Sequence, residues 1–238
     1  MTQSIIIGSG EIGKALYKVL KDTHDIVIRD TEPLEVDKVN VMHICFPYSE
    51  GFCGYVEAYK KEYNPDFTVI HSTIPVGTAT KCGAFHSPVR GVHPNLEGGI
   101  RTFVKYLAPR SVELANYFME AGIKIKQLEK PEITELAKML STTYYGLAIS
   151  FHSYANKLAK ETGTGFESVM TEFNTTYNQG YKELGMDNVV RPVLYAPTKG
   201  GKKGHCVLEN KALLKEQFGD DVILKAIAKH FGDEETND

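Results

Sequence analysis

The sequence has no tryptophan, no long apolar run and no excess of charge of one sign. Its apolar stretches stop well short of the roughly 18 residues that a membrane-spanning helix needs, so no membrane span is predicted. The formal net charge of −3 gives no electrostatic reason to expect nucleic acid or an anionic membrane as a partner. With 13 tyrosines and 11 phenylalanines as aromatic bulk, the composition is that of an ordinary soluble globular protein.

Cysteine is also scarce. The four cysteines show no C-x-x-C spacing, which predicts reduced thiols rather than a disulfide framework or a zinc site, and no metal site is expected. The first predicted strand begins almost at Met1, which leaves no room for a signal peptide. We therefore expect a cytoplasmic protein.

The N-terminal region carries a glycine-rich turn. A buried parallel strand is predicted at residues 5–7 and an amphipathic helix at residues 11–21. Between them Gly8, Gly10 and Gly13 have the G-x-G-x-x-G spacing of a dinucleotide-binding turn. The first glycine makes the tight turn, the second lets the backbone approach a pyrophosphate, and the third lets helix and strand pack closely.

A carboxylate follows this turn at the spacing that NAD-binding domains use. The strand predicted at residues 25–29 ends at Asp30, about 20 residues beyond the glycines, where an acid would bind the ribose hydroxyls of NAD. Asp30 would repel the 2′-phosphate of NADP, whereas the neighbouring Arg29 leaves NADP open. The residues expected to bind the cofactor are Gly8, Gly10, Glu11, Ile12, Gly13, Asp30, Phe46, Pro47, Ser72 and Thr73.

Strands and helices are predicted to alternate through the first half of the chain. Further strands are expected at residues 39–46, 67–71, 104–108 and 123–128, and helices at 51–63, 80–85 and 111–121. This order predicts a Rossmann-type α/β domain with a parallel sheet over residues 1–130. The expected cofactor residues would then meet at the carboxyl ends of the strands, beside an irregular segment, 86–95, that we expect to hold substrate.

The pattern becomes helical at Pro131. One helix is predicted over residues 131–163, about 48 Å long, which is too long for a small domain to cover. We therefore expect a homodimer through this helix, with Met139, Tyr144 and Phe151 buried between the subunits. Helices at 166–184, 209–218 and 222–230 would complete a small all-α domain over 131–231, with a basic loop at 199–206 and a disordered tail at 232–238.

Four separated motifs resemble the UDP-glucose/GDP-mannose dehydrogenase family. They are the glycine turn, the segment Ser72-Thr-Ile-Pro-Val-Gly-Thr78, the long helix with Glu135-Leu-Ala-Lys138, and the glycine-rich loop that ends in Gly204-His205-Cys206. The resemblance extends from Ile5 to about Leu214. It implies oxidation of a primary alcohol of a nucleotide sugar to a carboxylate with two NAD per turnover.

The resemblance also implies catalytic roles. Cys206 would be the nucleophile that forms a thiohemiacetal and then a thioester, and the lysines of the loop before it would favour its thiolate. Lys138 would steady an oxyanion on the reacting carbon, and Thr73 would order a water or a substrate hydroxyl. The alternatives are a small buried cysteine, a solvated helix lysine and a strand-end cap.

This chain departs from the family at several positions. It has Val89 after Pro88, where the family carries glutamates, and Thr142 where the family has asparagine. Asn210 replaces an aspartate, so it would orient water without taking its proton. His93 is a candidate replacement base, or part of a plain turn. Three cations, Arg90, Arg101 and Lys105, are candidates for a substrate phosphate or carboxylate, or for a solvated surface.

The family's third domain, which grips the nucleotide, is missing, so the substrate does not carry over directly. Three functions remain open. The first is an NAD-dependent dehydrogenase of an alcohol or sugar-type substrate that uses Cys206 and Lys138. The second is a two-electron 6-phosphogluconate or hydroxyacid type of dehydrogenase that uses Lys138 and no cysteine. The third is a non-catalytic NAD-binding module.

Overall fold

The computed structural model describes residues 3–196 and 205–231. The chain divides into two compact units, residues 1–138 and 139–238, and the division falls inside one long helix. The domain boundary expected at residue 130 stays a prediction. None of the described helices has the length and apolar character needed to cross a membrane.

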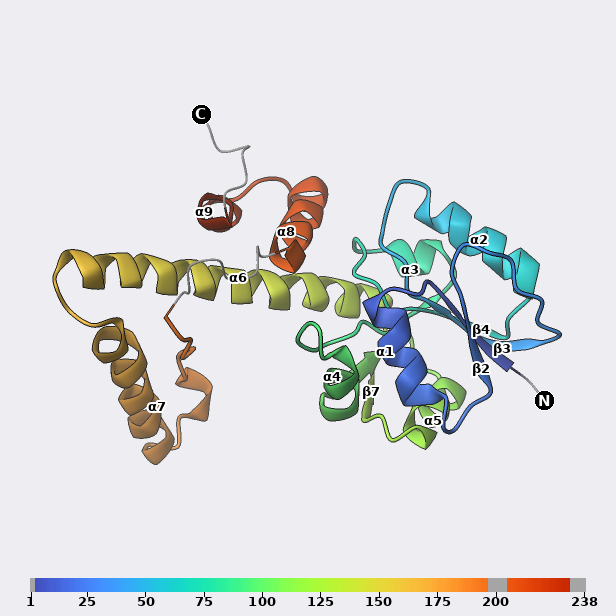
Figure 1. Cartoon of the computed structure of the whole chain (residues 1–238), viewed down its shortest axis with the longest axis horizontal. Helices are drawn as coiled ribbons and strands as arrows, with labels where there is room; N and C mark the ends of the chain where they lie inside the picture. The colour runs from blue at the N-terminus through green and yellow to red at the C-terminus, as the bar shows by residue number, and fades with distance from the viewer. Residues whose placement is uncertain (1–2, 197–204, 232–238) are drawn as a thin grey trace. The chain divides into compact units, whose positions relative to one another are not determined.

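The described part of the first unit contains a five-stranded parallel sheet (Figure 1). Its strands are β1 (Gln3–Ile7), β2 (Ile26–Arg29), β3 (Val39–Ile44), β4 (Phe67–Ile70) and β5 (Phe85–His86), in the order β2-β1-β3-β4-β5. β1 is an interior strand, and its Ile6 lies opposite Ile28 of β2 and His43 of β3. The predicted Rossmann-type sheet is thereby confirmed.

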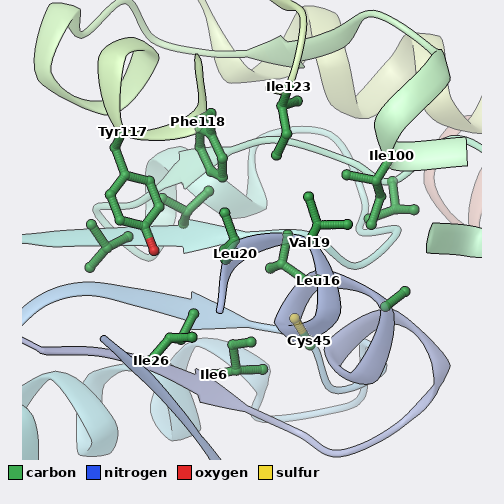
Figure 2. Packing of buried hydrophobic residues seen from close by; sticks show 14 of the residues in the cluster. Ile6, Leu16, Val19, Leu20, Ile26, Cys45, Ile100, Tyr117, Phe118 and Ile123 are labelled. Carbon is green, nitrogen blue, oxygen red and sulfur yellow. The ribbon is translucent and has the colours of Figure 1, made fainter. Parts of the chain in front are cut away.

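Helices cover both faces of this sheet. They are α1 (Glu11–Leu20), α2 (Phe52–Tyr63), α3 (Thr78–Lys81), α4 (Leu96–Thr102) and α5 (Val112–Glu120). Ile6 belongs to one core with residues of α1, α4 and α5, whereas Ile5 and Ile7 belong to a second core with residues of α2. This alternation along β1 follows from the two-residue period of a strand. Figure 2 shows Leu16, Val19 and Leu20 of α1 packed in the first core.

Three predicted elements of this unit differ from the structure. The helix expected at 80–85 ends at Lys81, and Phe85–His86 instead pairs with β4 as β5. The helix α4 lies in a segment for which none was expected. The strands expected at 104–108 and 123–128 form as β6 (Lys105–Leu107) and β7 (Ile125–Gln127), but they pair in a separate two-stranded sheet.

All the secondary structure that the described residues of the second unit form is helical, and residues 190–196 are irregular. The helix α6 (Pro131–Glu161) begins in the first unit and continues into the second, and it is followed by η1 (Glu167–Glu172), α7 (Phe173–Glu183), η2 (Asp187–Val189), α8 (His205–Phe218) and α9 (Val222–Phe231). A Cβ on Gly146 of α6 would lie 2.3 Å from the side chain of Val207, so glycine lets α6 and α8 approach closely. The long helix and the small helical region are confirmed.

The sequence predicted that the basic, glycine-rich loop extends to Cys206. This C-terminal boundary of the loop is wrong. The helix α8 already begins at His205, so Cys206 lies in its first turn. The preceding loop residues, 197–204, and the predicted disordered tail, 232–238, lie outside the described residues.

The expectation of four reduced thiols is also wrong. Cys53 in the first turn of α2 and Cys82 at the end of α3 form a disulfide, with their Cα atoms 5.1 Å apart. Cys45 and Cys206 are free. The two bonded cysteines are separated by 29 positions in the sequence, and only the packing of α2 against the α3 segment brings them together.

Candidate functional site

The glycine turn is the most closely packed part of the candidate site. Gly8 has φ +107°, which favours glycine, and a Cβ on it would lie 3.0 Å from the backbone nitrogen of Phe46. A Cβ on Gly13 would lie 2.0 Å from the carbonyl oxygen of Gly8. By contrast, a Cβ on Gly10 would have no neighbour within 4 Å. The turn is therefore closed toward the protein and open above Gly10.

Asp30 lies beside this turn. Its Oδ1 accepts a hydrogen bond of 3.2 Å from the backbone N–H of Ser9, and this bond is the main cause that lowers the pKa of Asp30. The carboxylate is exposed and ionised at neutral pH. Arg29 was the residue that kept NADP as an alternative cofactor. Its buried guanidinium donates 2.5 Å hydrogen bonds to Glu62 and to the hydroxyl of Tyr63.

The ends of β3 and β4 meet next to the turn. The hydroxyl of Ser72 donates a 2.5 Å hydrogen bond to the carbonyl of Phe46, which joins two residues that were expected to bind cofactor. Ser72 is buried, Thr73 is half-buried and Pro47 is exposed. Ile12 lies partly buried against the core below the turn.

His93 reaches the glycine turn from the 86–95 segment. Its Nδ1 contacts the carboxylate of Glu11, the first residue of α1, and both side chains are exposed. The segment expected to hold substrate therefore returns to the predicted cofactor turn.

The first two turns of α6 pack on the same unit. The Nζ of Lys138 donates a 3.0 Å hydrogen bond to the carbonyl of Val89. The carboxylate of Glu135 accepts hydrogen bonds from the backbone N–H groups of Gly77 and Ala79, at 2.6 and 2.7 Å. Burial raises the pKa of Glu135, while these two backbone bonds oppose the shift. The motifs at 72–78 and 135–138 are thus physically joined.

The other predicted catalytic residues lie in the second unit. Cys206 is exposed in the first turn of α8. Asn210 is buried, and its Nδ2 donates a 2.6 Å hydrogen bond to the carbonyl of Cys206. Thr142 is half-buried on α6. Thr73, His93 and Lys138 belong to the first unit, so the six predicted catalytic residues divide equally between the units.

The three cations that were candidates to bind a substrate phosphate or carboxylate are Arg90, Arg101 and Lys105, and each has contacts within the protein. Lys105 is 4% exposed, so it is neither a solvated surface residue nor open to substrate. Arg90 lies over the rings of Phe103 and Tyr106. Arg101 donates to Glu97 and to the carbonyl of Lys18.

Comparisons with known proteins place the fold. Searches against models of protein families and among curated proteins found no match. Among solved structures, the chain is similar to a UDP-D-ManNAc dehydrogenase from Pyrococcus horikoshii, with a TM-score of 0.74 and 16% identity over 97% of this chain and 68% of that one. A UDP-glucose dehydrogenase from Pyrobaculum islandicum gives a TM-score of 0.69 and 15% identity over 98% and 68%.

A second kind of dehydrogenase is equally similar in fold. The 3-hydroxyisobutyrate dehydrogenase of Mycobacterium tuberculosis gives a TM-score of 0.71 and 14% identity over 100% of this chain and 95% of that one. At these identities the likeness concerns the fold alone. This chain spans about two thirds of the two nucleotide-sugar dehydrogenases and nearly all of the hydroxyacid enzyme.

Proposed function

We propose that this protein is an NAD-dependent oxidoreductase that oxidises an alcohol group. The observation that carries the proposal is the glycine turn next to the exposed carboxylate of Asp30. A Cβ would clash at Gly8 and Gly13 but not at Gly10, which is the pattern expected where a pyrophosphate approaches the middle glycine. The N-terminus of α1 begins at Glu11, directly after this glycine, and favours a bound anion.

These residues fit NAD better than NADP. The Asp30 carboxylate is free to accept hydrogen bonds from ribose hydroxyls and would repel a 2′-phosphate. Arg29, the nearest cation in the sequence, is held by Glu62 and Tyr63. Bound NAD would supply the acceptor for a hydride. Gly8, Gly10 and Gly13 would hold its pyrophosphate, and Asp30 its adenosine ribose.

The substrate that we propose is a sugar or sugar-nucleotide-like alcohol. The Lys138 ammonium, fixed on the Val89 carbonyl, would donate a hydrogen bond to the oxygen of the reacting carbon. The exposed Cys206 would add to an aldehyde carbon to form a thiohemiacetal, and the helix N-terminus at which it lies favours a negative charge. Thr73 and His93 would contribute a hydroxyl and an imidazole on the first unit.

A second candidate is a two-electron dehydrogenase of a hydroxyacid or phosphogluconate type. The observation that favours it is the likeness in fold to the hydroxyisobutyrate enzyme, whose TM-score of 0.71 is comparable to the 0.74 and 0.69 of the nucleotide-sugar enzymes. In this reaction the neutral amine of Lys138 would take the proton of the substrate hydroxyl while the hydride passes to NAD, and Cys206 would have no role.

One experiment separates these functions. Binding of NAD and NADP is measured by calorimetry, and NADH formation is then followed with UDP-glucose, other nucleotide sugars, hydroxyacids and phosphosugars. Two NADH per acid, lost in Cys206→Ser, supports the first candidate. One NADH per product, kept in Cys206→Ser and reduced at least about 100-fold in Lys138→Ala, supports the second. Binding without turnover on any substrate would leave the non-catalytic module, and no binding of either nucleotide would overturn the proposal.

We also propose a homodimer through the helix predicted at 131–163. Its described part in the second unit exposes a row of apolar side chains, Leu140, Tyr144, Phe151, Tyr154 and Leu158. Met139, which was expected to lie between subunits, is already fully buried within the chain.

A further inference from the structure

Lys105 is a buried lysine with an unusual set of partners. It lies on β6, and its Nζ donates hydrogen bonds to the carbonyl of Ser87, at 2.6 Å, and to that of Pro88, at 3.4 Å. Among residues 3–196 and 205–231, no carboxylate forms an ion pair with it. The Nζ of Lys105 also lies 5.9 Å from the centre of the Phe118 ring. No ion pair among the described residues offsets the cost of burying this lysine, so its contacts with the carbonyls call for an explanation other than charge pairing.

The carbonyls that Lys105 holds belong to the segment that also receives Lys138. Directly after β5 come three residues whose carbonyls accept hydrogen bonds from the two lysines. Lys105 donates to the carbonyls of Ser87 and Pro88, and Lys138 donates to the carbonyl of Val89. The hydroxyl of Ser87 also donates a 2.7 Å hydrogen bond to the carbonyl of Tyr106, beside Lys105 on β6. The position of the Val89 carbonyl therefore depends on the two carbonyls before it.

A chain of hydrogen-bonded buried side chains also supports the carbonyl of Ser87. His71 Nδ1 donates a 2.8 Å hydrogen bond to Ser87, because a carbonyl can only accept. His71 Nε2 is then an acceptor for His43 Nδ1, at 3.0 Å, and His43 Nε2 accepts from the hydroxyl of Tyr117, also at 3.0 Å. Both histidines are neutral, since burial lowers their pKa values far below the usual range. The Ser87 carbonyl thus has two donors that fix it.

Other titratable groups also face Lys105. The pKa of Lys105 is lowered to about 7, mainly by burial; Cys45 opposes this shift and the charge of Lys138 adds to it. The charge of Lys105 in turn lowers the pKa values of three buried histidines, His43, His71 and His86. The ammonium or the amine of Lys105 can donate to the carbonyls, so the hydrogen bonds do not require the charge.

We propose that Lys105 is a positioning residue that holds the carbonyls of Ser87 and Pro88, so that the carbonyl of Val89 fixes the Nζ of Lys138. The proposal rests on the proposed function, because Lys138 has a chemical role only in the dehydrogenase reaction. Lys105 touches neither substrate nor cofactor. It acts on the reaction through the backbone of residues 87–89.

The test has two measurements, the chemical reactivity of the Lys138 amine in the absence of substrate and the steady-state kinetics of the enzyme. Competitive labelling of the full-length protein with trace acetic anhydride, read by mass spectrometry, gives the reactivity of each lysine and needs no substrate. It is applied to wild type, to Lys105→Met, and to the matched control Lys126→Met, an exposed lysine on the paired strand β7. Steady-state kinetics follow on the substrate found for the wild type.

In Lys105→Met, we expect the labelling rate of Lys138 to rise several-fold and kcat to fall about 10- to 100-fold with KM unchanged, because a catalytic group misplaced by about 1 Å is that costly. Lys126→Met should match wild type in both measurements. Unchanged labelling of Lys138 in a folded Lys105→Met protein overturns the proposal, even if the kinetics change.

Two other outcomes are covered, a Lys105→Met variant that does not fold and a wild type that shows no activity. If Lys105→Met does not fold, Lys105→Gln replaces it, because its shorter amide cannot keep both carbonyl contacts, and the same two labelling outcomes apply. If the wild type turns over no substrate, the proposed function fails, but the labelling still decides whether Lys105 positions Lys138.

Discussion

At the scale of single residues, the glycine turn offers a test in which stability and cofactor binding separate. A methyl group at Gly13 would meet the Gly8 carbonyl at 2.0 Å, so Gly13→Ala should lower the free energy of unfolding by about 1–3 kcal/mol. A methyl group at Gly10, where φ is −68°, meets nothing within 4 Å. Gly10→Ala should therefore keep wild-type stability and weaken NAD binding at least about tenfold, because a pyrophosphate would take that space.

Urea denaturation and calorimetry with NAD measure both quantities. Gly146→Ala is a control in the second unit, where a methyl group would meet Val207 at 2.3 Å, so it should destabilise the protein without changing NAD binding. Wild-type NAD affinity in Gly10→Ala would show that the cofactor does not approach this turn.

Lys105 gives a prediction about pH. Burial lowers its pKa to about 7, whereas a lysine in the unfolded chain titrates near 10.4. Between these values the unfolded state binds the extra proton, so this residue makes the protein more stable as pH rises, by about 1.4 kcal/mol per pH unit. Below about pH 7 both states are protonated and the dependence ends.

The measurement is urea denaturation at several pH values from about 6 to about 9.5 for wild type, Lys105→Met and Lys126→Met. The difference in unfolding free energy between wild type and Lys105→Met should change with pH, and the difference from Lys126→Met should stay flat. Parallel curves for Lys105→Met would mean that the folded-state pKa is not lowered.

The contrast between Gly13 and Lys105 shows which residues the sequence could predict. The spacing of the glycines is local, and the tightest contact, between a Cβ on Gly13 and the Gly8 carbonyl, arises within the turn itself, so the turn was predictable. The environment of Lys105 depends on Ser87, whose carbonyl accepts from its Nζ, and on His71, which donates to the same carbonyl, and both residues are distant from Lys105 in the sequence. Sequence spacing carries no signal for such contacts, and Lys105 was therefore interpreted as a surface or substrate-binding cation.

At the scale of elements, the disulfide between α2 and the α3 segment should contribute measurably to stability. For a separation of 29 residues, loop-closure entropy predicts a stabilisation of roughly 3–4 kcal/mol. Cys53→Ser should lose about this amount in urea denaturation without reductant, and wild type should lose it when reductant is added. Cys206→Ser is the control, because Cys206 is free and exposed.

A thiol count checks the same assignment. The native oxidised protein should react rapidly at one thiol, Cys206, and at two once it is unfolded, since Cys45 is buried. Four reactive thiols in unfolded, unreduced protein would contradict the disulfide.

Element length explains most of what the sequence missed in the fold. The helix α6 has a long, regular apolar pattern and was predicted closely, and the short strand β1 was recognised from its unbroken run of isoleucines next to the glycine turn. The strand β5 has two residues, too few to show an alternation, and it is defined by its pairing with β4. The helix α4 begins at an Asn95 cap within a segment rich in glycine and proline, which obscured its short pattern.

At the scale of the whole molecule, the apolar row on α6 calls for a partner surface. Leu140, Tyr144 and Phe151 are 50%, 61% and 57% exposed, and further apolar residues continue the row to Leu158 at helical spacing. From Leu140 to Leu158 the row is about 27 Å long. Monomeric proteins rarely expose a contiguous apolar surface of this kind, so a second copy of the chain is the occupant that we expect.

The predicted mass in light scattering is therefore twice the 26.5 kDa of one chain. Tyr144→Glu together with Phe151→Glu should weaken the dimer at least about 100-fold, because both charges would be buried in an apolar contact. The matched control is Tyr55→Glu, since Tyr55 is 56% exposed and also lies on a helix, but in the first unit. It should remain dimeric. Because NAD would bind to residues of the first unit, the monomeric double variant should still bind NAD, and a wild type that is monomeric at micromolar concentration would rule out the dimer.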